Sequence, residues 1–146
     1  MTTGTFPGVY MDSRQHSHRK AIICLCHDKS MLQVRQMLLE HFGYKVFPTS
    51  SPEDAAKVAV DHCPDMLLLD NGNPEIDFEQ VASQVKRACP DLIAVVLSPY
   101  YYAARKGRGA IDRFVATDDG PDMLISQIEE LFGEQSDGSS SGVGPI

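Results

Sequence analysis

The chain has 146 residues, of which 42% are hydrophobic, and a formal net charge of −7 at pH 7. This length and this apolar content suit a single domain with one buried core. The acidic charge argues against direct binding to nucleic acid, because contacts to phosphate groups require a basic surface. No stretch approaches the roughly 20 consecutive apolar residues that span a bilayer, and residues 1–20 are polar, so we expect no membrane contact and no signal peptide.

Four cysteines occur in the chain, at Cys24, Cys26, Cys63 and Cys89. Their spacing is not that of a zinc ribbon, and three of them adjoin apolar strand or helix patterns, as small buried residues do. Cys24 and Cys26 fall on one face of a predicted strand, so a soft-metal cluster with His27 is the less favoured alternative. We therefore expect a reducing, cytoplasmic location.

The two ends of the chain are predicted to be flexible. Residues 1–19 contain Gly, Pro, Ser, Thr and His without periodicity, and residues 133–146 form a Gly/Ser-rich tail. Between them, in residues 20–132, strand-like and helix-like patterns alternate five times. This alternation predicts a parallel sheet with helices on both faces.

The first two pairs of strand and helix have clear patterns. Residues 21–26 are an apolar run suited to a central strand, and residues 30–42 place apolar side chains on one helical face before Gly43 ends the helix. A short strand is predicted at 45–47. The helix that follows, at about 51–62, begins with Ser, Pro and two acidic residues, which are typical of a helix start.

The third strand ends on an acidic residue. Residues 66–69 are wholly apolar, Asp70 follows, and the next residues include Asn, Gly and Pro, which favour a turn. A buried parallel strand of this kind places its last residue in the crevice where α/β sheets bind ligands. Asp70 is therefore the first candidate functional residue. A helical stripe at 78–89 and an apolar strand at 92–97, ending at Ser98, come next.

The last third of the chain is less regular. We expect a short, weak helix at about 100–106, an edge strand at 113–116 and a final helix. Three consecutive tyrosines cannot all face one core. Tyr100, Tyr101 and Arg105 therefore form a candidate binding surface, since exposed Tyr and Arg are enriched in binding hot spots. An equally compatible interpretation is that the tyrosines pack inside and the basic residues only aid solubility.

The segment from Cys63 to Pro74 resembles the phosphoacceptor strand of bacterial response-regulator receiver domains. In that family Pro and Asp precede several large aliphatic residues, the acceptor Asp and, a few residues later, Pro. The resemblance covers about residues 20–132 and implies a flavodoxin-like α/β fold, with a doubly wound, five-stranded parallel sheet in strand order 2-1-3-4-5. It also implies a signalling module rather than an enzyme, with Asp70 as the phosphoacceptor.

The same resemblance assigns roles to residues beyond Asp70. Ser98 stands at the hydroxyl position after the fourth strand, and Phe114 stands at the aromatic switch position. Thr117 stands where the family has a lysine that contacts the phosphoryl group, and Asp118 stands where it has a cis-proline. Because a neutral hydroxyl replaces a cation at Thr117, we expect weaker stabilisation of a transferring phosphoryl group.

The acidic pair that holds Mg2+ in the family is missing. Cys26 and His27 stand at its two positions, and Asp28 lies one residue further on. Asp70 and the carbonyl of Gly72 would be the remaining ligands, so we expect Mg2+ binding to be weak or absent. If its ring faces Asp70, His27 would compensate the charge in place of the metal. Otherwise it is a solvated loop residue.

Two functions are compatible with these residues. In a phosphorelay, Asp70 would accept a phosphoryl group from a histidine kinase or a phosphotransfer protein and pass the signal to a downstream protein. A pseudo-receiver would keep the fold and bind partners without phosphorylation. Asp70 and Ser98 favour the first function, whereas the residues at the acid and lysine positions favour the second. The resemblance places partner contacts, including a possible homodimer, on the face from the fourth to the fifth helix.

Overall fold

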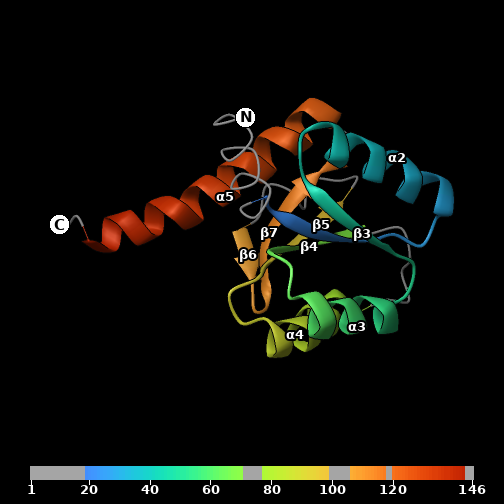
Figure 1. Cartoon of the computed structure of the whole chain (residues 1–146), viewed down its shortest axis with the longest axis horizontal. Coiled ribbons are helices and arrows are strands. Elements are labelled where there is room, and N and C mark those ends of the chain that lie inside the picture. The colour runs from blue at the N-terminus through green and yellow to red at the C-terminus, as the bar shows by residue number, and fades with distance from the viewer. Residues whose placement is uncertain (1–18, 71–76, 99–105, 118–119, 144–146) are drawn as a thin grey trace, which may run out of the picture.

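A six-stranded sheet lies at the centre of the fold, with helices on both faces (Figure 1). The computed structural model describes residues 19–70, 77–98, 106–117 and 120–143. The strands, in chain order, are β2 (Ala21–Leu25), β3 (Lys45–Thr49), β4 (Met66–Asp70), β5 (Ile93–Ser98), β6 (Lys106–Arg108) and β7 (Ile111–Ala116). The helices are α2 (Lys29–His41), α3 (Pro52–His62), α4 (Phe78–Ala88) and α5 (Pro121–Val143).

The strand order confirms the predicted topology. The sheet reads β3-β2-β4-β5-β7-β6, and every neighbouring pair from β3 to β7 is parallel. Counted along the chain without β6, this is the order 2-1-3-4-5. Because these strands run in one direction, their carboxyl ends meet at one edge of the sheet.

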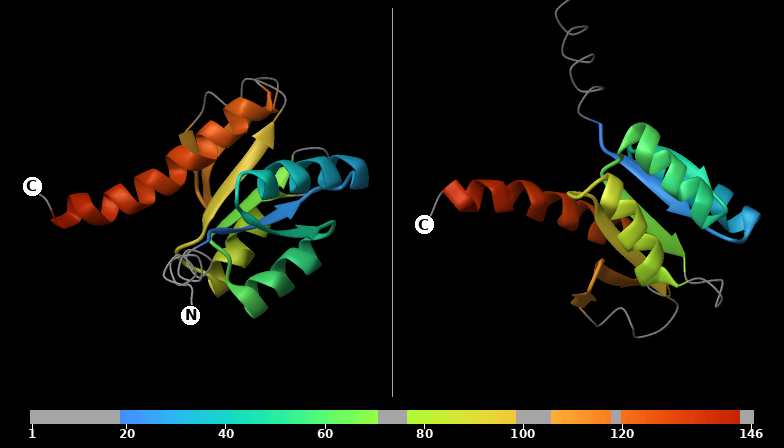
Figure 2. Two further views of the ribbon diagram at one scale, coloured as in Figure 1. Left: turned by 45° about the horizontal axis from the view of Figure 1, so that its top comes forward. Right: turned by 90° about the horizontal axis from the view of Figure 1, so that it is seen from below.

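Two apolar layers cover the sheet. On one face, Ile22 and Cys24 pack in a cluster with residues of α2 and α5, and on the other face Ile23 and Leu25 pack with residues of α3 and α4. Alternation of side chains along a strand produces this division, and the central strands are apolar on both sides because both sides are covered. Figure 2 shows these layers from two further sides, with the end of α5 projecting beyond the sheet.

Short polar side chains begin three of the helices. Each accepts a hydrogen bond from a backbone N–H that has no partner inside its helix, and this contact fixes where the helix starts. The bonds run from Met31 N to Asp28 Oδ1 (3.0 Å), from Asp54 N to Ser51 Oγ (3.1 Å) and from Gln80 N to Asp77 Oδ1 (3.2 Å). The predicted helix start with Ser, Pro and two acidic residues is therefore confirmed.

The segment that leads into β7 differs from the prediction. We expected a helix at about 100–106, but Lys106 lies in the strand β6. Residues 99–105, with Tyr100, Tyr101 and Arg105, lie outside the described residues.

An antiparallel turn explains the added strand. β6 pairs with β7, so the strand predicted as an edge at 113–116 is covered by a neighbour. Gly109, with φ +59°, lies in the turn between them, and the Glu79 carboxylate accepts a hydrogen bond from Ala110 N at 3.0 Å. Pairing gives hydrogen-bond partners to backbone groups that an edge strand would expose.

Helix α5 continues to Val143, through residues that we expected to lie in a flexible tail. The last helix is therefore longer than the 20–132 domain implied, whereas the flexibility of residues 133–146 stays a prediction. Once a helix is nucleated, each further residue adds one backbone hydrogen bond, so Gly133 lowers the helix propensity without ending the helix. Within the described ranges, no helix combines the length and the apolar composition needed to cross a membrane. The predicted leader, apart from Arg19, lies outside the described residues.

Candidate functional site

Three candidate polar residues lie along the carboxyl edge of the sheet. Asp70 ends β4, Ser98 ends β5 and Thr117 directly follows β7. The three strands are neighbours, with Asp70 opposite Leu97 and Ser98 opposite Ala116. The topology therefore brings these residues to the crevice in which parallel α/β sheets bind ligands.

Arg35 of α2 holds the Asp70 carboxylate. The Arg35 Nε–H donates a hydrogen bond to Asp70 Oδ2 at 2.8 Å, and Arg35 Nη2 lies 2.6 Å from the same oxygen. The two side chains are 13% and 14% exposed. At such low exposure, water screens the attraction only partly, and a charge that lost its partner would be costly. The ion pair is therefore the central electrostatic feature of this edge.

The cation beside Asp70 is not the one that the sequence suggested. His27 is exposed just after β2, and the ion pairs of the described residues do not include it. The hypothesis that His27 compensates the Asp70 charge is wrong, because Arg35 does so. Helical periodicity was the missed signal, since Arg35 lies three residues after Leu32 and four before Leu39, both of which pack in or against the core cluster. A basic side chain on this inward stripe requires an acidic partner.

Two buried thiols lie near the ion pair. Cys24 in β2 and Cys26 just after it are 1% and 3% exposed, which confirms the prediction that they pack in the core. Burial raises the pKa of Cys24 to about 12, and the positive charge of Arg35 opposes this change. Burial also raises the pKa of Cys26, and the negative charge of Asp70 raises it further. Both thiols are therefore neutral at pH 7 and are poor nucleophiles.

The described residues around Asp70 do not fit a Mg2+ ion. Mg2+ prefers several oxygen ligands in a nearly octahedral arrangement. Here the Asp70 carboxylate already binds a guanidinium, the nearby Cys26 offers a neutral sulfur, and Asp28 caps α2. In the part of the chain that the structure describes, no three His, Cys, Asp or Glu side chains lie close enough to hold a metal ion. Gly72 lies outside that part.

The remaining predicted residues have different environments. Ser98 is fully buried at the end of β5, and Thr117 is half-buried. Phe114 is half-buried and packs against the core cluster on the face of α3 and α4. Its assignment as an aromatic switch stays a prediction.

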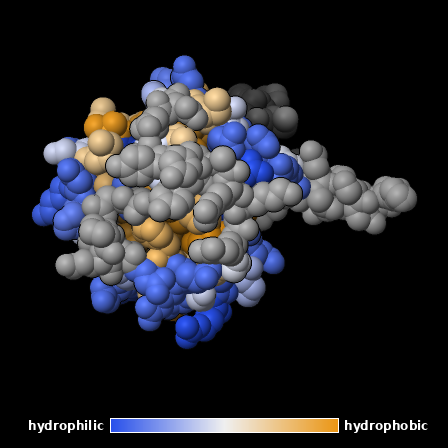
Figure 3. Space-filling model, turned by 180° about the vertical axis from the view of Figure 1, so that it is seen from behind, coloured by the Kyte–Doolittle hydropathy of each residue, from blue (hydrophilic) through white to orange (hydrophobic). Residues whose placement is uncertain are grey.

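An apolar cavity of about 360 Å3 adjoins Arg35. Residues of α2, of the start of α5 and of the ends of β5 and β7 line it, among them Met31, Val34, Leu124 and the polar Thr117. On the outer side of α2, Met31, Val34 and Met37 are 42%, 58% and 68% exposed. Figure 3 shows apolar surface over α2, at the upper left. The ion pair therefore borders an apolar surface rather than a polar pocket.

Comparison with known proteins identifies the fold. No protein-family model matches the chain, and no curated protein matches it. The fold is similar to that of a CheY-like response regulator receiver domain protein from Methanospirillum hungatei JF-1, with a TM-score of 0.70 and 17% identity over 82% of this chain and 98% of that one.

Two further similar structures concern one response regulator. The response regulator protein TrrA from Thermotoga maritima, in complex with Mg2+ and BeF, matches with a TM-score of 0.66 and 22% identity over 77% of this chain and 98% of that one. A complex of histidine kinase ThkA with TrrA gives a TM-score of 0.65 and 22% identity over 77% of this chain and 97% of the matched one. The chain therefore has the fold of CheY-like receiver domains, as its sequence predicted.

Proposed function

We propose that this protein is a signalling module with a receiver fold that binds protein partners without Mg2+-dependent phosphorylation of Asp70. The Arg35–Asp70 ion pair is the observation that carries this proposal. A receiver that accepts phosphate needs a carboxylate free to attack and a divalent cation to neutralise the phosphoryl oxygens. In this protein a permanent cation already holds that carboxylate.

Electrostatics argue against Mg2+ beside this pair. Two unit charges about 4 Å apart interact by about 4 kcal/mol at an effective dielectric constant of about 20. A divalent ion bound to Asp70 would face a repulsion of this order from Arg35 for each of its charges, unless Arg35 moved away. If Arg35 moved away, its guanidinium would lose its anionic partner at a position where the side chain is only 13% exposed, which is costly.

The outer face of α2 supports a role in protein binding. Met31, Val34 and Met37 are all more than two fifths exposed, and clustered exposed apolar side chains mark interaction sites. One similar structure is a response regulator in complex with a histidine kinase. By analogy, we take a histidine kinase or a phosphotransfer protein as the partner of this face.

Phosphorylation of the purified protein tests the proposal. The protein, Asp70→Asn and Arg35→Ala would each be incubated with Mg2+ and a small acyl phosphate, and their intact masses would be measured. We expect no phosphoryl adduct on the unmodified protein. An adduct that forms on it and is lost in Asp70→Asn would overturn the proposal.

The second candidate function is the phosphorelay receiver with Asp70 as phosphoacceptor. It is favoured by the positions of Asp70 and Ser98 at the ends of adjacent strands, and by the cation that Arg35 supplies in place of the family's lysine. On this alternative Arg35 would stabilise the transferring phosphoryl group. The same experiment then gives an adduct on the unmodified protein and a much slower reaction in Arg35→Ala.

A further inference from the structure

The sequence contains Cys-Pro-Asp twice, beginning at Cys63 and at Cys89. Cys63 is the C-cap of α3 and Cys89 is the C-cap of α4. Each motif thus occupies the same place in its own unit, between a helix and the next strand. Those strands, β4 and β5, are parallel neighbours, and α3 and α4 pack on the same face of the sheet.

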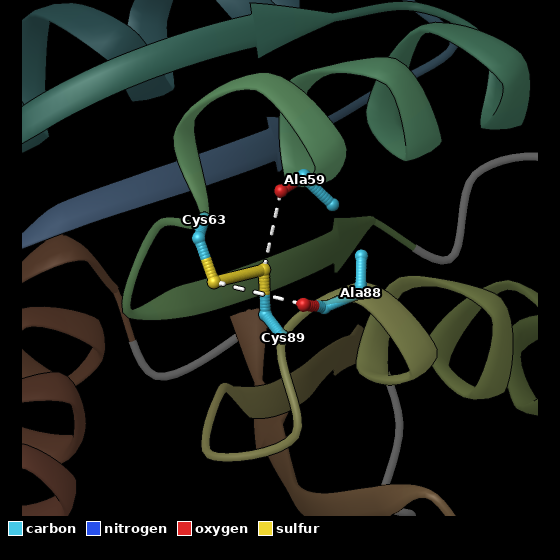
Figure 4. Close-up of a disulfide and its surroundings, with 4 residues drawn as sticks. All are labelled: Ala59, Cys63, Ala88 and Cys89. Atoms are coloured by element: carbon cyan, nitrogen blue, oxygen red, sulfur yellow. Dashed lines mark hydrogen bonds between the residues drawn. A yellow bond between two sulfur atoms is a disulfide. The ribbon is translucent and has the colours of Figure 1, made fainter.

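This repetition brings the two cysteines together. Neighbouring strands lie about 4.8 Å apart, so equivalent positions of adjacent units are separated by about one strand spacing. The Cα atoms of Cys63 and Cys89 are 5.5 Å apart, although the residues are 26 positions apart in the chain. This separation lies within the range that a disulfide spans, and the structure joins the two sulfurs at the ends of α3 and α4 (Figure 4).

The two sulfurs differ in access to solvent. Cys63 is exposed, at a backbone φ of 44° that turns the chain away from α3. Cys89 is 2% exposed, and its Sγ lies 3.2 Å from the carbonyl oxygen of Ala59. Cys63 Sγ lies 3.9 Å from the carbonyl oxygen of Ala88. An external thiol can therefore reach Cys63, whereas a reduced Cys89 thiol has a carbonyl to which it can donate.

We propose that Cys63 and Cys89 form a reversible redox-modification site that exchanges with low-molecular-weight thiols and disulfides of the glutathione class. In oxidation, the Cys63 thiolate attacks glutathione disulfide and releases one glutathione thiolate. The Cys89 thiolate then attacks Cys63 Sγ, forms the bridge and releases the second glutathione. The two protein thiols lose two electrons, glutathione disulfide gains them, and the two protons pass to the released glutathione thiolates.

The other two cysteines do not compete for this reaction. Cys24 and Cys26 are buried, and burial raises the pKa of each. Thiol exchange needs an accessible thiolate, which neither residue provides in the folded protein. Modification is thereby directed to the pair at the ends of α3 and α4.

The bridge closes a loop that contains β4. The ends of this loop are 26 positions apart in the chain, and the loop includes Asp70. Linking the ends of such a loop lowers the entropy of the unfolded chain, and on this ground we expect oxidation to raise the melting temperature by about 5–10 °C. Oxidation would thus stabilise the fold by restricting the unfolded chain, without altering the Arg35–Asp70 pair.

Intact mass and alkylation test the proposal on the full chain. The folded protein would be equilibrated in glutathione buffers of graded composition, denatured in acid, and treated with a thiol-alkylating reagent. We expect two of the four cysteines to resist alkylation in the oxidising buffers, a peptide that links Cys63 to Cys89, and recovery of all four thiols when excess reduced glutathione is added to the folded protein.

Variants separate the bridge from other effects of oxidation. The melting temperature of Cys63→Ser/Cys89→Ser should be the same in oxidising and reducing buffers. Four alkylated cysteines after oxidation, a glutathione adduct on Cys63 without the bridge, a bridge that involves Cys24 or Cys26, or a bridge that excess glutathione leaves intact would each overturn the proposal.

Discussion

The two ends of β4 are held by different kinds of contact. At the carboxyl end, Asp70 binds the guanidinium of Arg35. At the amino end, Asp65 accepts a hydrogen bond from Ala21 N at 2.8 Å, and Cys63 is bonded to Cys89. The partners at the amino end come from the neighbouring strand and the neighbouring β/α unit, so the topology of the sheet sets them. The partner at the carboxyl end is one long side chain from a helix. A single substitution in α2 can therefore change the chemistry of the site while the fold is kept.

Among substitutions at the two ends of β4, the largest expected effect comes from separating the two charges at the carboxyl end. Arg35→Ala leaves Asp70 as a carboxylate of low exposure without its cation, and we expect the free energy of unfolding to fall by about 3 kcal/mol. Urea denaturation measures this change. Arg87→Ala removes an exposed arginine from α4 and serves as the matched control. Equal effects of the two substitutions would show that the ion pair adds no more to the free energy of unfolding than an exposed arginine does.

Alkaline pH should affect the free thiols beside that pair and not the bridged cysteines. Burial raises the pKa of Cys24 from 9.0 to about 12. A raised folded-state pKa stabilises the fold below the unfolded value, and this contribution is lost as the pH rises from about 9 through about 12, by at most about 1.4 kcal/mol per pH unit. Chemical denaturation at graded pH measures the slope. In Cys24→Ala the free energy of unfolding should fall less steeply with pH. An unchanged slope would show that other groups cause the pH dependence.

At the amino end, we expect a smaller loss from removing one acceptor. Asp65→Ala leaves the N–H of Ala21 without its side-chain partner, which costs about 1–2 kcal/mol for a partly buried donor. Asp61→Ala, on the exposed side of α3, is the control and should change stability little. If both substitutions had the same effect, the hydrogen bond between Asp65 and Ala21 would not hold this end of the sheet.

The smallest expected effect lies on the outer face of α2. Val34 is 58% exposed, so Val34→Ser should change the free energy of unfolding by no more than about 0.5 kcal/mol. Leu39 is fully buried on the same helix, and Leu39→Ala should cost about 2–5 kcal/mol. Thermal melts of both variants give the comparison. A large loss in Val34→Ser would mean that this face is part of the core rather than a surface for a partner.

The sequence predicted those features that have a periodic pattern of apolar residues along the chain. The apolar run before Asp70 and the turn residues after it located the third strand and its acidic end. Five alternating patterns predicted a parallel sheet, and the resemblance to receiver domains implied its strand order. The two free cysteines were predicted as buried because they lie on an apolar strand pattern. Apart from the strand order, each of these inferences depends on local periodicity, which the strands and helices preserve.

Contacts between distant elements were not predicted. The Arg35–Asp70 pair joins residues 35 positions apart, and the motif alignment directed attention to His27 instead. The bridge between Cys63 and Cys89 was visible only as a repeated Cys-Pro-Asp, whose meaning depends on β4 and β5 being neighbours. β6 is three residues long and has no periodic pattern of its own. In each case the missing information was which elements pack side by side.

A Mg2+ titration followed by NMR tests the central claim, that Arg35 takes the place of the metal at Asp70, most directly. The carbonyl-carbon signal of the Asp70 side chain and the Arg35 Nε–H signal would be followed as Mg2+ is raised into the millimolar range. The ion pair predicts that both signals stay in place, and that the Asp70 signal responds to Mg2+ only in Arg35→Ala. A saturable shift of the Asp70 carboxyl signal in the unmodified protein, absent in Asp70→Asn, would contradict the account.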